Sequence, residues 1–202
     1  MTKIKNSKAM IVILSAPSGG GKSSIAQKLL AQDENLSLSI SVTTRAPRAS
    51  ESDGVDYFFK TREEFQNMMN ADMMLESAEI YGNLYGTPVQ HVESTLAQGT
   101  DVLFDIDSQG AYQIAEKMKD RIVSIFIIPP SIEALRARLE SRAQDDKATI
   151  DKRMKLAKDE MEHAKNYDYM VVNDDFNQAV TEIQQIIHTQ RKQRDYKQRV
   201  SK

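Results

Sequence analysis

A glycine-rich segment near the N-terminus has the residue types that bind phosphate. Residues 15–24 read Ser-Ala-Pro-Ser-Gly-Gly-Gly-Lys-Ser-Ser, between an apolar run at 10–14 and a helical pattern at 25–30. Consecutive glycines let the backbone turn its N–H groups toward an anion, and the start of a helix adds the positive end of its dipole. We expect this loop to hold nucleotide phosphates, with Lys22 as a mobile cation on the terminal phosphates and the Ser23 hydroxyl as a ligand of Mg²⁺.

The segment follows the P-loop pattern G-x-x-x-x-G-K-[ST] with one departure, because Ala16 stands where the first glycine belongs. A positive φ at this position would strain an alanine. The alternative interpretation is a flexible turn with a chance Lys-Ser behind it, and the strand and helix patterns on both sides disfavour it. The motif predicts a nucleotide-binding site and leaves the reaction open.

Two carboxylates end another apolar run. Residues 102–107 read Val-Leu-Phe-Asp-Ile-Asp, so Asp105 and Asp107 project from the same side of the expected strand. An acidic residue at the carboxyl end of a buried strand beside a P-loop is typical of a Mg²⁺ ligand, direct or through water. We assign Asp105 to the metal and Asp107 to the side of the acceptor. The alternative is that both carboxylates cap the helix that follows Ser108.

Two arginines flank an Ala-Pro dipeptide where a further strand-like run ends. The guanidiniums of Arg45 and Arg48, held by a rigid proline, can fork a phosphate in a bidentate manner. We expect the phenols of Tyr57 and Tyr85 to donate to the same oxygens. The alternative is a chance pair of exposed arginines.

A third group of cations lies in a predicted pair of helices. It comprises Arg138, Arg142 and Arg153. A mobile helix pair would bring these guanidiniums onto a transferring phosphoryl group, whose charge is spread over oxygens that a general base cannot neutralise. The alternative is that they form ion pairs with Glu140 or Asp146.

The elements that position these groups alternate between strand-like runs and helical patterns, which favours a parallel sheet flanked by helices. The strand-like runs occur at 10–15, 38–43, 102–106, 122–128 and 169–172. We therefore expect an α/β protein with the three-layer αβα core of P-loop NTPases, a small antiparallel β-rich insertion and a helical lid. The expected divisions are 1–39 for the core with the P-loop, 40–90 for the insertion, 91–130 for the core, 131–165 for the lid, and 166–202 for the core and C-terminal helix.

Local signals refine this outline. Thr61 and Glu64 form a predicted capping box at the start of a short helix. Thr87 is a predicted N-cap, with Pro88 at the first helical position. We interpret the basic stretch 191–194 as a solvated helix end, with an RNA-binding tail as the lesser alternative.

Composition excludes several classes of function. The 202 residues include no cysteine, which excludes disulfides and thiolate-rich zinc sites, and the three histidines are not at metal-ligand spacing. The formal net charge of −2 gives no general attraction to nucleic acid or to a membrane. Apolar runs such as 122–128 are too short to cross a bilayer, and the N-terminus lacks the apolar stretch of a signal peptide. We expect a cytoplasmic protein that binds small molecules, and the sequence leaves monomer or homo-oligomer open.

Several segments together resemble the guanylate kinase family over almost the whole chain. They are residues 15–24, 41–48, 54–59, 81–87, 105–110, 128–131 and 171–175. The first segment is common to many nucleotide enzymes. The stretch Thr-Thr-Arg-Ala-Pro-Arg at 43–48, the tyrosine turn at 81–87 and Asp-Ile-Asp-Ser-Gln-Gly at 105–110 are far more specific.

The resemblance implies that a phosphoryl group passes from ATP to GMP, or dGMP, with Mg²⁺, giving ADP and GDP. It implies that one set of residues binds ATP, with Asn173 near the adenine: Ser18, Gly19, Gly20, Gly21, Lys22, Ser23, Ser24 and Asn173. The residues implied in catalysis are Lys22, Arg45, Arg138, Arg142 and Arg153.

The same resemblance places GMP in the 40–90 insertion. Its phosphate would be bound by Ser41, Arg45, Arg48, Tyr57 and Tyr85, with Ser41 alternatively seating the base. Glu76 and Thr87 would read guanine, because a carboxylate accepts from both the N1–H and the 2-amino group, a donor pair that adenine lacks. Asp107 would touch the acceptor base or the arginine network.

Two other functions stay open on the sequence. One is a catalytically inactive guanylate-kinase-like module that binds protein partners. Lys22, Ser23 and Asp105 argue against it, since a binding module has no use for a metal and γ-phosphate site. The other is a P-loop kinase of another phosphorylated ribose compound, and Glu76 with the tyrosine turn favours guanine instead.

Overall fold

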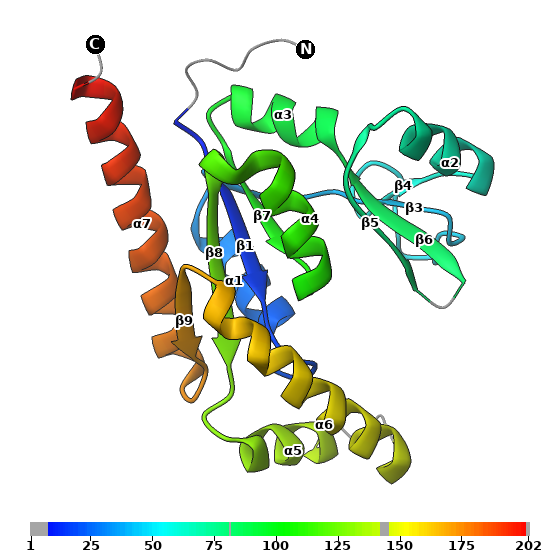
Figure 1. Ribbon diagram of the computed structural model, residues 1–202, viewed down its shortest axis with the longest axis vertical. Coiled ribbons are helices and arrows are strands. Elements are labelled where there is room, and N and C mark those ends of the chain that lie inside the picture. The colour runs from blue at the N-terminus through cyan, green and yellow to red at the C-terminus, as the bar shows by residue number, and fades with distance from the viewer. Residues whose placement is uncertain (1–7, 81, 142–145, 201–202) are drawn as a thin grey trace.

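A five-stranded parallel sheet forms the core of the molecule (Figure 1). The computed structural model describes residues 8–80, 82–141 and 146–200. In spatial order the strands are β2 (Leu36–Leu38), β7 (Asp101–Asp105), β1 (Ile11–Ser15), β8 (Ile122–Ile128) and β9 (Tyr169–Val172). Each neighbouring pair is parallel, and the predicted α/β class with a parallel sheet is confirmed.

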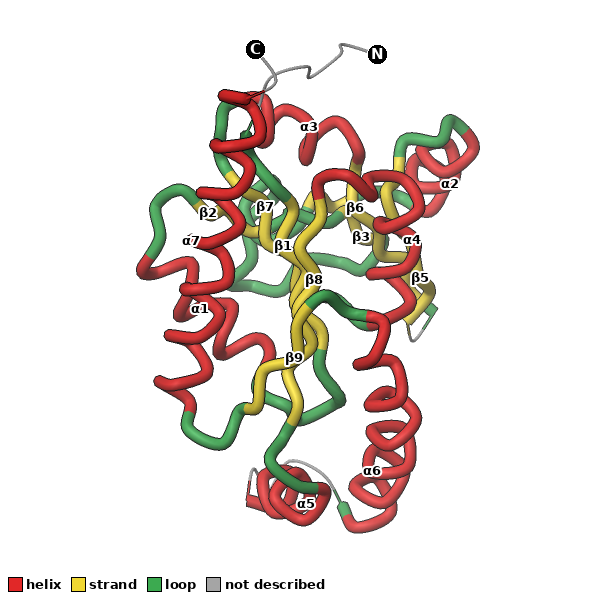
Figure 2. The backbone as a smooth tube through the Cα atoms, turned by 60° about the vertical axis from the view of Figure 1, so that its left-hand side comes forward, coloured by secondary structure: helices red, strands yellow, loops and turns green. Residues whose placement is uncertain are grey.

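Helices cover both faces of this sheet because side chains alternate along its buried strands. These helices are α1 (Lys22–Gln32), α3 (Val89–Ala97), α4 (Ser108–Met118) and α7 (Phe176–Val200). Val12 and Leu14 of β1 pack in one apolar cluster with α1 and α7, whereas Ile11 and Ile13 pack in another with α3 and α4. Figure 2 shows α1 and α7 on one side of the sheet and α4 on the other. Within the described ranges, no helix has the length and apolar content needed to cross a bilayer.

A second, smaller sheet stands beside the core (Figure 1). Its strands in spatial order are β4 (Phe58–Phe59), β3 (Val42–Thr43), β6 (Asn83–Pro88) and β5 (Met74–Ile80). β6 is antiparallel to both β3 and β5, and β4 is parallel to β3. Helix α2 (Arg62–Asn70) begins at the predicted capping box of Thr61 and Glu64 and buries Phe65 against this sheet.

A pair of helices, α5 (Ile132–Ser141) and α6 (Lys147–Glu162), extends from the end of the core (Figure 1). The pair has its own apolar cluster, formed by Leu135, Leu139, Ile150, Met154 and Ala157. Two short 3₁₀ turns, η1 (Lys119–Arg121) and η2 (His163–Asn166), lead into β8 and β9. The pair can therefore stay packed as a unit independently of the sheet.

The run at 38–43 is not one strand, and this part of the prediction was wrong. β2 ends at Leu38 in the core sheet, and β3 begins at Val42 in the smaller sheet. The N–H of Ser39 still donates to the carbonyl of Leu103 at 2.8 Å, after which the chain leaves the core. Alternation of polar and apolar residues is the same in both pieces, so it cannot report which sheet each piece joins.

Thr87 does not cap α3, and this prediction was also wrong. Thr87 belongs to β6, and Pro88 occupies the N-cap position with no side-chain cap. The Thr87 hydroxyl instead donates to Oε1 of Glu76 on the neighbouring strand at 2.7 Å. A buried acceptor across the sheet therefore takes the hydroxyl that the local pattern assigned to the helix.

The basic stretch at 191–194 is not simply a solvated helix end. Nε of Arg191 donates to Asp101 at 2.7 Å, and Nη1 of Arg191 approaches Asp33 at 2.7 Å. Arg194 donates to the carbonyls of Asp120 and Ile122 at 3.1 and 3.3 Å. These bonds hold the tail of α7 at the first residues of β7 and β8, Asp101 and Ile122.

Asp101→Ala is expected to lower the free energy of unfolding by about 3 kcal/mol, because it removes a buried partner of Arg191. The Asp101 side chain also accepts from the N–H of Met10 at 2.7 Å, so two donors would lose their acceptor. Urea denaturation measures the change. Asp195→Ala, at the exposed pair with Lys8, is the control and should stay within about 1 kcal/mol of wild type. An equal effect of both variants would contradict the assignment.

Candidate nucleotide-binding site

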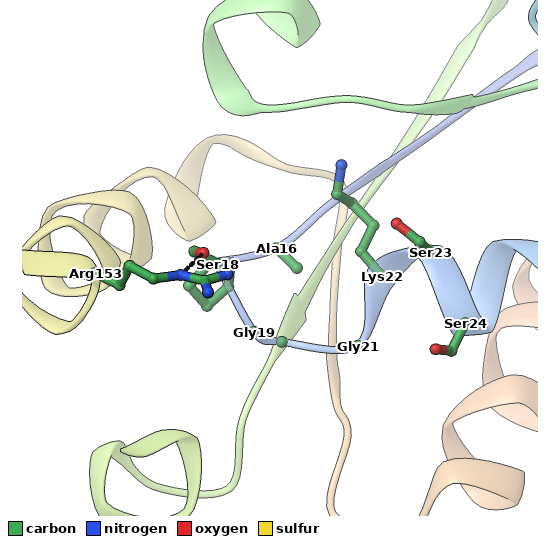
Figure 3. Close-up of a pocket in the computed structure, with 10 residues that line it drawn as sticks. Ala16, Ser18, Gly19, Gly21, Lys22, Ser23, Ser24 and Arg153 are labelled. Atoms are coloured by element: carbon green, nitrogen blue, oxygen red, sulfur yellow. Dashed lines mark hydrogen bonds between the residues drawn. The ribbon is translucent and has the colours of Figure 1, made fainter. Parts of the chain in front are cut away.

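The loop between β1 and α1 surrounds a cavity of about 530 Å³, lined by residues 16–24 and by Arg153 of α6 (Figure 3). Gly19 and Gly21 have φ of +90° and +93°, a conformation that other residues rarely adopt. Gly21 is the N-cap of α1, so the positive end of this helix lies at the cavity. Among the described residues other than glycine, positive φ occurs at Asp72, so Ala16 carries no such strain. The cavity is suited to an anion.

Lys22 forms an ion pair with Asp105, the last residue of β7. β7 lies next to β1 with Asp105 opposite Leu14, so the end of β7 is beside the loop. The two side chains are only 19% and 21% exposed, which strengthens their attraction relative to a surface pair. The structure thus brings together a cation and a carboxylate that are 83 residues apart in the sequence.

Asp107 is held differently from Asp105. Its side chain caps α4 by accepting from the N–H of Gly110 at 2.9 Å. The capping alternative therefore holds for Asp107, whereas Asp105 pairs with the loop lysine. The charge of Asp107 also helps to raise the pKa of Glu76, after the larger effect of burial.

Arg45 is clamped by Glu51, a residue that the sequence reasoning missed. Nη2 of Arg45 donates to both carboxylate oxygens of Glu51 at 2.8 and 3.0 Å. This bond raises the pKa of Arg45 and lowers that of Glu51. The guanidinium also lies 5.5 Å from the ring centre of Tyr57, whose ring is 6.1 Å from that of Tyr85. Arg45 and the two tyrosines are therefore together, as expected.

Arg48 is far more open to solvent than Arg45. Its side chain is 75% exposed, and its Nη1 approaches Glu51 only to 4.0 Å. The backbone closes a turn here, because the N–H of Glu51 donates to the carbonyl of Arg48 at 3.0 Å. The alternative interpretation of a chance pair of exposed arginines therefore fits Arg48 but not Arg45. The sequence places the carboxylate of Glu51 three residues after Arg48 in a turn-rich stretch, and this spacing could have predicted a contact with the arginines.

Glu76 and Thr87 form a buried polar pair on the smaller sheet, and the partly buried Ser41 lies beside them. Glu76 and Thr87 are opposite each other on β5 and β6, which brings their side chains together. Glu76 is 8% exposed and Thr87 is fully buried. The hydroxyls of Ser41 and Thr87 lie 3.3 Å apart. Burial raises the pKa of Glu76, the bond from Thr87 opposes this, and Asp107 adds to it. The group offers a carboxylate and two hydroxyls to a polar ligand.

Two arginines of the helix pair, Arg138 and Arg153, contact residues in the phosphate loop or beside it. Nη2 of Arg138 donates to the carbonyl of Asn173 at 2.6 Å, and Nε of Arg153 donates to Oγ of Ser18 at 3.0 Å. Arg142 lies outside the described residues. The alternative ion-pair partners are engaged elsewhere: Glu140 approaches Arg136 at 3.9 Å, and Asp146 caps α6. Arg138 and Arg153 are therefore directed toward the loop.

Asn173 supports the back of the loop. The residue is 4% exposed, and its Nδ2 donates to the carbonyl of Gly20 at 2.8 Å. A Cβ at Gly21 would lie 2.5 Å from this nitrogen, and φ of Gly21 is +93°, so a larger residue would be strained and would displace the Asn173 amide. Asn173, which was expected near the adenine, thus contacts the backbone of the phosphate loop.

Glu160 of α6 is a second residue that the sequence reasoning missed. Its Oε2 accepts from the N–H of Ser18 at 3.0 Å. Burial raises the pKa of this half-buried carboxyl group. Glu160 lies two helical turns after Arg153, a spacing that places both residues on one face of the helix. This spacing could have predicted that Glu160 lies beside the same site as Arg153.

A parallel sheet, a phosphate-binding loop after β1 and a carboxylate at the end of the adjacent β7 define a P-loop nucleotide-binding protein. The sequence model of the family described as guanylate kinase matches residues 8–190. The chain belongs to the guanylate kinase family, and it is an enzyme.

Individual relatives agree with this family. The chain is 53% identical over 188 residues to the guanylate kinase of Rickettsia felis, covering 93% of this chain and 97% of the relative. It is 51% identical over 188 residues to that of Mesorhizobium japonicum, covering 93% and 86%. The crystal structure of guanylate kinase from Anaplasma phagocytophilum superposes with a TM-score of 0.71 at 39% identity, covering 92% of this chain and 88% of that one. The resemblance seen in the sequence is confirmed.

Proposed function

We propose that this enzyme transfers the γ-phosphoryl group of ATP to GMP, or dGMP, giving ADP and GDP. The observation that carries the proposal is the buried Glu76–Thr87 pair on a sheet beside the P-loop. A buried carboxylate is costly unless a ligand supplies donors, and guanine supplies two in the required direction. The family membership supports the same reaction.

The donor side of the site is proposed to bind ATP through the loop. Backbone N–H groups at the start of α1 have no intrahelical partner, so those of residues 21–23 suit phosphate oxygens. The ATP-binding set is Ser18, Gly19, Gly20, Gly21, Lys22, Ser23, Ser24 and Asn173. Asn173 contributes by fixing the carbonyl of Gly20. Lys22 would turn its ammonium from Asp105 toward the terminal phosphates.

The residues present fit a Mg²⁺ ion that is shared with the nucleotide. The described residues hold no cluster of three acidic, histidine or cysteine side chains, so a cage built from protein alone does not form among them. Mg²⁺ usually keeps several waters and is held by one or two protein groups plus phosphate oxygens. The hydroxyl of Ser23 and the carboxylate of Asp105 would be those groups. When bound, the ion would neutralise charge on the phosphates.

The acceptor side is proposed to bind GMP on the smaller sheet. Glu76 would accept from the N1–H and the 2-amino group, and Thr87 would hold the carboxylate in place. Asp107, at the N-terminus of α4, would contact the base or the arginines. The phosphate would be bound by Ser41, Arg45, Arg48, Tyr57 and Tyr85. Arg45 has donors beyond those that bind Glu51, so the clamp can orient it toward a phosphate.

Charge neutralisation is the proposed basis of catalysis. The transferring group carries charge on its equatorial oxygens, and positioned cations stabilise it without a general base. The proposed catalytic residues are Lys22, Arg45, Arg138, Arg142 and Arg153. We also propose that 40–90 is the GMP-binding part and 131–165 the lid, with the core formed by 1–39, 91–130 and 166–202. ATP and GMP as substrates support a cytoplasmic location.

The test is a coupled assay of ADP release with GMP, dGMP, AMP, UMP, CMP and dTMP as acceptors. We expect activity to be highest with GMP or dGMP. Highest activity with another acceptor would support a kinase of a different phosphorylated ribose compound. Absence of activity with all acceptors would support a protein-binding module, which the family relatives do not favour.

A further inference from the structure

Ser18 of the phosphate loop is held at two points by one face of α6. Its N–H donates to Oε2 of Glu160 at 3.0 Å, and its Oγ accepts from Nε of Arg153 at 3.0 Å, the bond drawn in Figure 3. Arg153 and Glu160 are seven residues apart, about two helical turns, so both project from the same face. Ser18 therefore makes two polar contacts with α6.

The next loop residue contacts the other helix of the pair. A Cβ at Gly19 would lie 2.8 Å from Cδ2 of Leu139 and 3.1 Å from Cδ1 of Leu135. Both leucines are buried in the cluster that joins α5 to α6. The loop backbone at Gly19 thus rests directly on α5. The loop and the helix pair form a continuous packed unit at residues 18 and 19.

Glu160 is a carboxylate in a place where anions are to be bound. Burial raises the pKa of Glu160 most, and the charge of Asp107 raises it further. The bond from the Ser18 N–H and the charges of Lys22 and His163 lower it. A half-buried carboxylate is tolerated where donors compensate for lost water, and Ser18 supplies such a donor. The bond also removes the Ser18 N–H from the groups that could bind a phosphate. Ser18 therefore contributes to the ATP site by holding the loop on the helix pair, while the N–H groups at the start of α1 are the ones proposed to contact the phosphates.

We propose that Glu160 is a positioning residue for the donor site. Its carboxylate holds the Ser18 amide, keeps the loop docked on α5 and α6, and so keeps Arg153 directed at the phosphate cavity. Glu160 itself touches no reacting atom and acts through Ser18 and Arg153. Filling of the loop by phosphates is thereby coupled to the position of the helix pair. This proposal rests on the proposed function, because it takes the loop to be the ATP site.

Substitutions at Glu160 separate the hydrogen bond from the charge. Glu160→Ala is expected to lower kcat about tenfold and to raise the KM for ATP, with the KM for GMP within about twofold of wild type. Glu160→Gln keeps an oxygen that accepts from Ser18, so its kcat is expected to return to within about threefold of wild type. Glu162→Ala, at an exposed position of the same helix, is the matched control and should match wild type. An equal loss in the Ala and Gln variants at Glu160, or equal shifts in both KM values, would overturn the proposal.

A measurement on the ligand-free protein tests the contact directly. In ¹H–¹⁵N NMR spectra, the Ser18 amide proton is expected to move upfield in Glu160→Ala and to stay in place in Glu162→Ala. An unchanged Ser18 amide in Glu160→Ala would overturn the proposal. Calorimetric titration of the wild-type protein with ATP alone checks the proposed function separately. Absence of ATP binding would contradict that function, whereas the Ser18 amide decides the role of Glu160 in either case.

Discussion

Replacement of Lys22 by methionine is expected to lower kcat for GMP phosphorylation by about 10³-fold. Methionine keeps much of the length of the side chain and removes its charge. The lost cation is the one that we propose to face the terminal phosphates of ATP. The variant also leaves the carboxylate of Asp105 without its ion-pair partner beside the phosphates. The assay of ADP release at saturating ATP and GMP measures the effect.

Lys28→Met is the matched control, because Lys28 lies on the same helix and is exposed to solvent. We expect this control to retain the wild-type kcat. The KM for GMP should be similar in both variants, since Lys22 is proposed to act on the donor side. A Lys22→Met enzyme within about tenfold of the wild-type kcat would show that this lysine does not stabilise the transferring group.

Local patterns predicted the parts of the fold that depend on neighbours in the chain. The segment 15–24 runs from the last residue of β1 through the loop into the first turn of α1, as its flanking patterns indicated. The capping box at Thr61 was predicted correctly because its two partners are three residues apart. The prediction of a single strand at 38–43 was wrong because residues of this run belong to two different sheets with the same polar and apolar pattern. Register and sheet membership depend on partners that the local sequence does not contain.

The sequence indicated candidate residues for the site but not which of them contact one another. Lys22 and Asp105 were both expected, yet their pairing depends on β7 lying beside β1. The bond between Ser18 and Glu160 joins residues 142 apart, and no local spacing reports it. Glu51 was nearer to its partner Arg45, but a glutamate in a turn-rich stretch is ordinarily solvated. Polar contacts formed by tertiary packing were therefore the parts that the sequence could not supply.

Glu76→Gln is expected to lower kcat/KM for GMP by about 10²-fold and to leave ATP binding nearly unchanged. The amide of Gln keeps one acceptor but opposes one of the two guanine donors with its own NH₂ group. The effect should appear in steady-state assays with GMP varied at saturating ATP. A loss of ATP affinity with unaltered GMP kinetics would reverse the placement of the two sites.

The same substitution is expected to stabilise the ligand-free protein at high pH. The pKa of Glu76 is raised in the folded state, chiefly by burial, so ionisation favours unfolding. The contribution of Glu76 to stability is complete below its unfolded pKa of about 4.3 and is lost as the pH rises through the folded value. Glutamine avoids this loss. The Tm of Glu76→Gln should therefore exceed that of wild type at pH 8, and the difference should shrink toward pH 4.

Glu79→Gln is the control for both effects, because Glu79 lies on the same strand with its side chain 53% exposed. Its pair with Arg62 is at the surface, so neither GMP kinetics nor the pH dependence of Tm should change appreciably. We expect the Glu76 variant alone to gain Tm at pH 8 and to lose kcat/KM for GMP. This result would mean that the charge of Glu76 destabilises the folded protein but is needed to bind GMP. Guanine donors would supply the compensation that Thr87 gives only in part. A Glu76→Gln protein less stable than wild type at pH 8 would contradict this account.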